Sequence, residues 1–390
     1  MATWGLEWLE GIAAVWRQPL LYYGALLALA AGWRRVKRER HDFHVRVYSP
    51  WKEWRGLWTS GWLPGAVLSA VALGAGLVVP KEVVWTVTAL TVLLGLTMEA
   101  RLLSAAYTLG GTLLVLAMAE RGRMAVPWLR DGVEAAPVLA LWLTLLLAAE
   151  GWLIIRTRTE PASPQLLKSK RGMTIGRQWV QRLWFVPVVL PMAGGSLPSL
   201  PWWPFAVGGE GHSFWLVPFL IGFSQRRHHV RPPEAARREG RLVLLLAGVV
   251  AVLATGSVWY APLAVAAGAV AVIGREWIAF SGRRADSASP PRFARHPHGV
   301  VIVGVLPGSK AEKMGLSIGE VICKTNGVPV RTEAEFYEAL QRNRAFCKLE
   351  VIGDNGEVRF VQGALYEDEH HELGLLFVRE RGSLASEAVS

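Results

Sequence analysis

Cysteine is nearly absent from this sequence, since only Cys323 and Cys347 occur among 390 residues. So few cysteines exclude the disulfide framework of a small secreted domain. Both lie in apolar stretches that are expected to form strands, VICKT and AFCKL. We expect two buried free thiols in a reducing compartment rather than a disulfide.

Charged residues are also scarce, at 19% against 52% hydrophobic residues. A soluble protein of this composition would expose too much apolar surface, which indicates a membrane protein. Apolar runs of about 18 residues predict membrane-spanning helices. Such runs are Trp16–Trp33, Trp62–Val79, Val83–Met98, Leu102–Ala119, Val133–Ile155, Leu242–Tyr260 and Pro262–Phe280.

The stretch Trp179–Phe223 is ambiguous, because its apolar ends flank SLPSLPWWP and GGEGH. Two spans with an outer loop, or a re-entrant hairpin, both fit, and in both the chain enters and leaves on the same side. The fold class is therefore an α-helical membrane domain with about seven to nine spans, followed by a small α+β domain.

Residue sets that carry catalysis or transport are missing. His370-His371-Glu372 lacks the second histidine of a metalloprotease helix, and Gly194-Gly195-Ser196 has only His212 as a nearby intramembrane base. His41-x-x-His44 lies among basic residues that would repel a metal cation. These patterns predict no catalytic, cofactor or metal residues.

Ionisable residues near the spans bear on transport. Most fall at span ends or turns: Glu99, Arg101, Glu120 and Glu150. Glu210 and His212 could form a polar site within a span, although an outer loop fits them better. A protease or transporter regulated by the C-terminal domain is therefore the alternative function.

Basic residues gather in alternate loops. Eight Lys/Arg lie in Arg34–Arg55, six in Arg156–Arg177 and six in Arg226–Arg241. An excess of Lys/Arg marks cytoplasmic loops, so we expect the N-terminus outside and the C-terminal domain in the cytoplasm. Orientation and anionic lipid explain these loops better than nucleic acid does.

Five segments are expected along the chain. They are an interfacial helix (1–16), the membrane domain (17–282), a Ser/Pro-rich linker (283–294), a cytoplasmic domain (295–380) and a disordered tail (381–390). The N-terminus lacks the basic region and the cleavage site of a signal peptide.

The cytoplasmic domain carries a specific order of signals. A β-rich run at Val300–Leu306 leads into PGSKAEKMGL, then GEVICKTNG with the hairpin dipeptide Asn326-Gly327. Thr332-x-x-Glu335 is a capping box that opens a helix to about Asn343. This series of about 85 residues resembles a bacterial PDZ domain. The resemblance implies a module that binds a peptide as an added strand.

In PDZ domains a loop of the form Φ-G-Φ presents backbone N–H groups to the peptide carboxylate, usually near the start of the domain. Nothing before Val300 fits this pattern, whereas Leu373-Gly374-Leu375 does, followed by Leu376-Phe377-Val378. We infer a circular permutation in which the groove strand comes last. Tyr337 and Leu340 are expected as pocket walls. A closing core strand without a ligand is the alternative.

The multi-span base, the basic first loop RRVKRERHDFHVRVY and the non-catalytic PDZ-like domain together resemble the MinJ family of division-site determinants. That resemblance implies a non-enzymatic membrane scaffold at the septum and cell poles. Its implied partners are a DivIVA-like coiled-coil protein, a MinD-like ATPase and other division proteins, with anionic lipid at the basic loops. It implies no cofactor.

Overall fold

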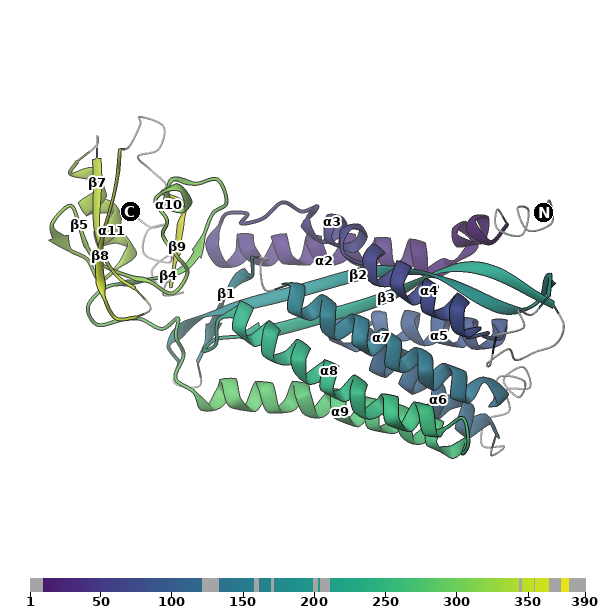
Figure 1. Cartoon of the computed structure of the whole chain (residues 1–390). Helices are drawn as coiled ribbons and strands as arrows, with labels where there is room; N and C mark the ends of the chain where they lie inside the picture. Colours follow the sequence, from purple (N-terminus) through teal and green to yellow (C-terminus); the bar gives the residue numbers. More distant parts are fainter. Residues whose placement is uncertain are drawn as a thin grey trace.

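The computed structural model describes residues 10–120, 133–157, 161–169, 172–198, 203, 211–343, 346–353, 355–364 and 373–378. It shows an elongated base of helices packed around a long β-hairpin, with a small α+β module at one end of the base (Figure 1). Residues 1–9 of the predicted interfacial helix lie outside this part. Residues 10–13 are helical and continue into a short 3-10 helix.

The helices of the base occur in two groups along the chain, one before the hairpin and one after it. They are η1 (Ala14–Arg17), α2 (Pro19–Phe43), α3 (Lys52–Thr59), α4 (Trp62–Ala75), α5 (Lys81–Gly95), η2 (Ala100–Leu103), α6 (Ala105–Glu120), η4 (Val133–Ala135), α7 (Ala136–Arg156), α8 (Pro232–Gly256) and α9 (Pro262–Ala288). α9 therefore continues through residues 283–288 of the predicted linker.

Among the described residues, four helical stretches are long and apolar enough to cross a membrane: Lys52–Ala75, Ala136–Arg156, Pro232–Gly256 and Pro262–Ala288. The predicted count of about seven to nine spans is not confirmed. α6 is apolar but shorter. α5 has 15 residues, which give about 22 Å of helix against a bilayer core of about 30 Å.

The ambiguous stretch Trp179–Phe223 forms a β-hairpin, so the prediction of two helical spans is wrong there. β1 (Ser163–Lys168), β2 (Thr174–Pro198) and β3 (Gly211–Arg227) make an antiparallel sheet in the order β1-β2-β3. Pro187 pairs with Pro218 across it. Prolines break a helix but fit positions whose N–H would point out of the sheet.

α4 and the segment that follows it cover part of the outer edge of β2. The Val189 N–H donates to Ser69 Oγ of α4 (2.9 Å), and the Val79 N–H donates to Pro191 O (3.1 Å). Gly65 of α4 lies so close to Pro187 O that a Cβ there would overlap it. These two hydrogen bonds pair backbone groups on this edge of β2, which would otherwise be costly to expose to lipid.

A buried ionic network joins α7, α8 and α9. Arg275 donates from Nε to Glu150 (3.2 Å) and from Nη1 to Glu239 (3.0 Å). Ser104 Oγ donates to Glu150 (2.7 Å), and Gln225 Nε2 donates to Glu239 (2.9 Å). Glu150 is thus fully buried in the helix packing. The prediction placed Glu150 at a span end or turn, whereas it lies inside α7 (Ala136–Arg156) and pairs with Arg275 of α9.

The C-terminal module holds the remaining elements. They are β4 (Val300–Val305), α10 (Lys310–Lys313), β5 (Val321–Thr325), β6 (Val328–Pro329), α11 (Glu333–Gln341), β7 (Phe346–Ile352), β8 (Val358–Ala364) and β9 (Leu375–Phe377). The main sheet has the order β8-β7-β5-β4-β9 and is antiparallel. Its core packs around Phe336, Leu349 and Phe377.

The capping box and the hairpin turn predicted from the sequence of the module are both present in the structure. Thr332 Oγ1 accepts from the Glu335 N–H (3.2 Å), so the predicted capping box starts α11. The predicted turn between β5 and β6 has positive φ at Asn326 (51°) and Gly327 (83°). Both cysteines are free thiols, as predicted, but only Cys347 is buried, whereas Cys323 was also expected to be buried and is partly exposed.

Candidate functional site

The candidate binding site of the module lies between β9 and α11. β9 pairs with β4, with Val305 opposite Leu375 and Ile302 opposite Phe377. It ends the strand order, so in the part of the chain that is described no strand covers its other edge. The Phe336 ring of α11 lies 5.1 Å from the Phe377 ring. A free strand edge beside a helix is the geometry that adds a peptide as a further strand.

The structure divides the predicted groove residues into two sets. Leu373, Leu375, Phe377 and Leu340 lie together in the module's core, with Tyr337 partly buried at its margin. Leu376 and Val378 pack on the opposite side, because successive side chains of a strand point to opposite faces. These two side chains cannot line a pocket against α11.

The carbonyl groups of the turn before β9 accept hydrogen bonds from the rest of the module. The Ala311 N–H donates to Leu373 O (3.0 Å), and the Leu306 N–H donates to Gly374 O (2.8 Å). In a trans peptide the N–H points opposite to the C=O. The N–H groups of Gly374 and Leu375 therefore point away from Ala311 and Leu306. In that direction they can donate hydrogen bonds to an anion.

Glycine is required at this turn. Gly374 has φ of 79°, and a Cβ there would overlap the side chain of Ser309. Residues 365–372, which precede the turn, are outside the described part of the chain.

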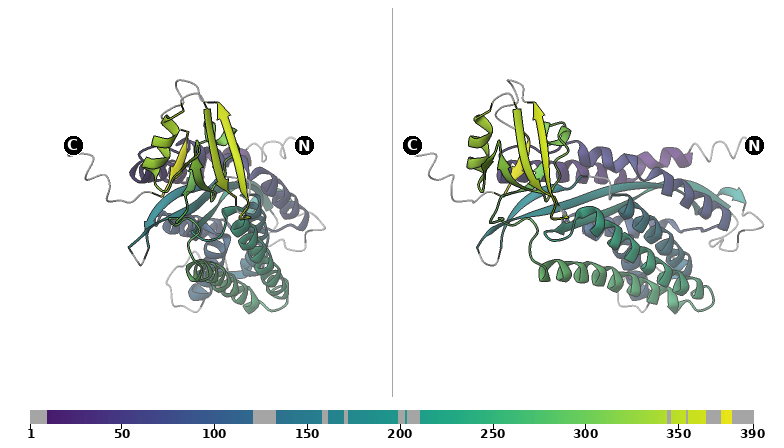
Figure 2. Two further views of the ribbon diagram at one scale, coloured as in Figure 1. Left: turned by 90° about the vertical axis from the view of Figure 1, so that its left-hand side faces the viewer. Right: turned by 60° about the vertical axis from the view of Figure 1, so that its left-hand side comes forward.

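The other face of β4 and β9 packs on the base, and Figure 2 shows the module against the end of the base. Val301, Val303 and Leu376 pack against an apolar group that includes Phe43 and Phe293. Two polar contacts accompany this packing. Gln178 Nε2 donates to Val303 O (2.6 Å), and the Gly176 N–H donates to Phe293 O (2.7 Å). The module is thus docked on β2 through one face of its sheet.

A second buried ionic group stabilises the base beside this contact. Arg35 of α2 donates to Glu53 of α3 (2.6 Å) and to Glu39 (2.8 Å). Glu39 in turn accepts from Ser163 Oγ of β1 (2.8 Å) and from the Val47 N–H (2.9 Å). The first basic loop is therefore an ordered part of the base. Sequence reasoning missed this, because a strongly basic stretch is typical of a solvated surface.

The thiols of the module are protected by their surroundings. Burial raises the pKa of Cys347 to about 12. Burial, followed by the charge of Glu350, also raises the pKa of Cys323. A raised thiol pKa leaves little thiolate at neutral pH, so neither group suits nucleophilic chemistry.

The residues considered for catalysis or transport do not assemble a described site. His212 is buried at the tip of the hairpin, edge-on to the Trp203 ring at 5.4 Å. Ser196 is in β2, and Glu210 lies outside the described residues. Within the described ranges, no group of three or more His, Cys, Asp or Glu side chains could hold a metal ion.

Comparison with known proteins agrees with both parts of the chain. Residues 301–352 match the PDZ domain family. The chain is 38% identical over 384 residues to "Cell division topological determinant MinJ" of Bacillus subtilis (strain 168), covering 97% of this chain and 96% of that protein. It is 26% identical over 356 residues to "Probable cell division topological determinant MinJ" of Lacticaseibacillus paracasei, covering 89% and 91% of the two chains.

Proposed function

The chain belongs to the MinJ family of cell division topological determinants, and from this premise we propose that it is a non-enzymatic membrane scaffold. In this proposal it joins a DivIVA-like coiled-coil protein at septa and poles to a MinD-like ATPase. The observation that carries it is a PDZ domain at one end of a membrane base, in which no described strand covers the outer edge of β9.

The groove supplies one of the two contacts that a bridge needs. An extended peptide would pair with the free edge of β9, while its terminal carboxylate accepts from the N–H groups of Gly374 and Leu375. Tyr337 would form the margin of the pocket and Leu340 its floor. In this scheme the groove strand is the last strand of a circularly permuted PDZ domain.

The orientation follows from charge. The described parts of the three basic segments, Arg34–Arg55, residues 156–157, 161–169 and 172–177, and Arg226–Arg241, lie at the ends of elements that approach the module (Figure 1). An excess of Lys/Arg marks the cytoplasmic side, so the module would face the cytoplasm, where its partners are.

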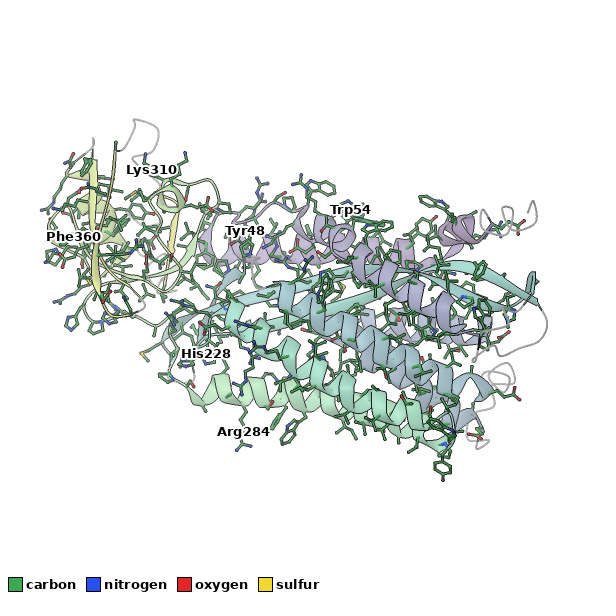
Figure 3. All side chains as sticks on the ribbon, viewed as in Figure 1. Tyr48, Trp54, His228, Arg284, Lys310 and Phe360 are labelled. Carbon is green, nitrogen blue, oxygen red and sulfur yellow. The ribbon has the colours of Figure 1, made fainter. Side chains whose placement is uncertain are left out.

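Imaging of the full-length chain in dividing rod-shaped cells tests the scaffold. A fluorescent fusion should gather at septa only when the coiled-coil partner is present. Tyr337→Ala should reduce capture of one partner in a pull-down from the same cells. Phe360→Ala is the matched control, because this exposed ring of β8 lies away from the groove (Figure 3).

Each half of the proposal has its own contrary result. Septal enrichment that persists without the coiled-coil protein would refute the bridging role. Capture of both partners by Tyr337→Ala at the level of Phe360→Ala would refute the groove as a contact, while leaving the bridging role in place.

A further inference from the structure

A cavity of about 1070 Å³ lies where the module meets the base. One wall is the loop and helix start from Arg46 to Arg55, and a second is the start of α8 at Arg231–Pro233. The module closes the third side with Leu306–Pro307 and Leu316–Ile318. Figure 3 shows Tyr48 on the base side of this junction.

The charges of the lining favour an anion. Four basic side chains line the cavity, Arg46, Lys52, Arg55 and Arg231, against one acidic side chain, Glu312. The Glu312 carboxylate already accepts from the Gly308 N–H (2.6 Å) at the start of α10. The basic side chains outnumber this one carboxylate, so the electrostatic potential in the cavity is positive. They come from two separate segments of the base, Arg46–Arg55 and Arg231.

Apart from Ser49 and Ser317, the other lining residues are apolar or aromatic. The Phe293 and Tyr48 side chains are buried there, and Leu306, Leu316 and Ile318 face them from the module side. A volume at the upper end of small-molecule sites, about 300–1,000 Å³, is far larger than an inorganic anion needs. Positive charge together with apolar surface fits an anionic amphiphile.

The level of the cavity relative to the membrane indicates which kind of amphiphile it binds. Two of the four candidate membrane stretches, Lys52–Ala75 and Pro232–Gly256, begin with residues of the cavity wall. The first residues of a span lie at the level of the phospholipid headgroups. Basic pockets at this level on the cytoplasmic side bind anionic headgroups.

We propose that this cavity binds an anionic phospholipid of the cytoplasmic leaflet. Its phosphate lies among Arg46, Arg55 and Arg231, and its apolar part lies against Leu306 and Ile318. Because base and module both contribute to the lining, the bound lipid links them and stabilises the docked position of the module. This site is independent of the bridging role and of the β9 groove.

The test uses the full-length chain reconstituted in nanodiscs and measures retained lipid by native mass spectrometry. Nanodiscs of phosphatidylglycerol and phosphatidylcholine should yield protein that keeps phosphatidylglycerol. The variant Arg46→Gln/Arg55→Gln/Arg231→Gln should bind it at least about tenfold more weakly. The control Arg237→Gln/Arg238→Gln/Arg284→Gln removes the same number of charges from exposed positions outside the lining and should bind like the unmodified chain.

A second variant tests the apolar part separately. Ile318→Trp keeps every charge but fills space beside the module, and it should also lose the lipid. Soluble glycerol phosphate should compete weakly, because it lacks the apolar part.

Three results would overturn the proposal. One is equal loss of lipid in the cavity variant and the charge control, which would indicate general surface attraction. Another is full competition by glycerol phosphate, which would indicate a simple anion site. The third is binding of an acidic peptide, but not phosphatidylglycerol, with the same dependence on the three arginines.

Discussion

Arg275 shows how single residues hold the base together. Its guanidinium lies between the carboxylates of Glu150 and Glu239, and neither Arg275 nor Glu150 is exposed. A buried ion pair need not stabilise a fold more than apolar packing would, but removal of one partner leaves uncompensated charge. Three helices meet at this one side chain.

Replacement of Arg275 is therefore expected to be severe. Arg275→Met should lower the free energy of unfolding by about 3–5 kcal/mol, because two buried carboxylates lose their counter-charge. Thermal unfolding of the detergent-solubilised protein measures this. Arg284→Met at an exposed position of the same helix is the control, and equal effects of the two would contradict the role of the network.

The two thiols should differ in reactivity from an exposed cysteine. Burial raises the pKa of Cys347 from 9.0 to about 12, so the folded state holds the proton more tightly than the unfolded state does. The contribution of the protonated Cys347 thiol to the stability of the folded state is complete below pH 9. It is lost as the pH rises toward 12.

Alkylation of single-cysteine variants measures this effect. With Cys323→Ser, which leaves only Cys347, iodoacetamide should react slowly at pH 8 until the module is unfolded. With Cys347→Ser, which leaves the less buried Cys323, reaction should be faster. Rapid alkylation of Cys347 in the folded module at pH 8 would contradict the raised pKa.

The β2–β3 hairpin shows what an element requires from its neighbours. α4 covers part of the β2 edge, where Ser69 accepts from the Val189 N–H, while Gly65 and the N-cap residue Gly61 lie close to backbone oxygens of β2. Glycine at these positions lets the helix approach the strand, as small residues do between membrane helices.

Two glycines of α4 form a matched pair for this contact. Gly65→Ala should destabilise the base by about 1–3 kcal/mol, because its Cβ would overlap Pro187 O. Gly74→Ala meets no atom within 4 Å and should be neutral or stabilising by up to about 1 kcal/mol. Unfolding temperatures in detergent compare them, and a stabilised Gly65→Ala protein would contradict the close approach.

β9 makes the module sensitive to loss of the chain's end. Deletion from His371 removes Leu373, Leu375 and Phe377 from the core. We expect lower thermal stability of the module and no partner capture in a pull-down. A truncated protein that kept both its stability and its partner would show that β9 is neither a core strand nor a groove strand.

At the scale of the whole molecule, the module and the base share an apolar contact and line a cavity together. Leu376 packs toward Phe43 on one side of the module, while Leu375 and Phe377 belong to the module's own core. The cavity lining includes Val305 of β4 but no residue of β9, so a partner on β9 and a lipid in the cavity would contact different parts of the module. The same small domain would then contact both a membrane lipid and a protein partner.

The sequence by itself determined the features that arise from neighbouring residues. The capping box at Thr332, the turn at Asn326-Gly327 and the apolar and basic segments are local signals, and PDZ-like order follows from them. Tertiary structure alone decided the rest. An apolar run such as Trp179–Phe223 suits a helix or a strand equally, and the covering residues of α4 lie more than a hundred positions away. The partners of Glu150 and the walls of the interface cavity likewise come from segments that only folding brings together, because periodicity reports which face of an element is apolar but not what will pack against it.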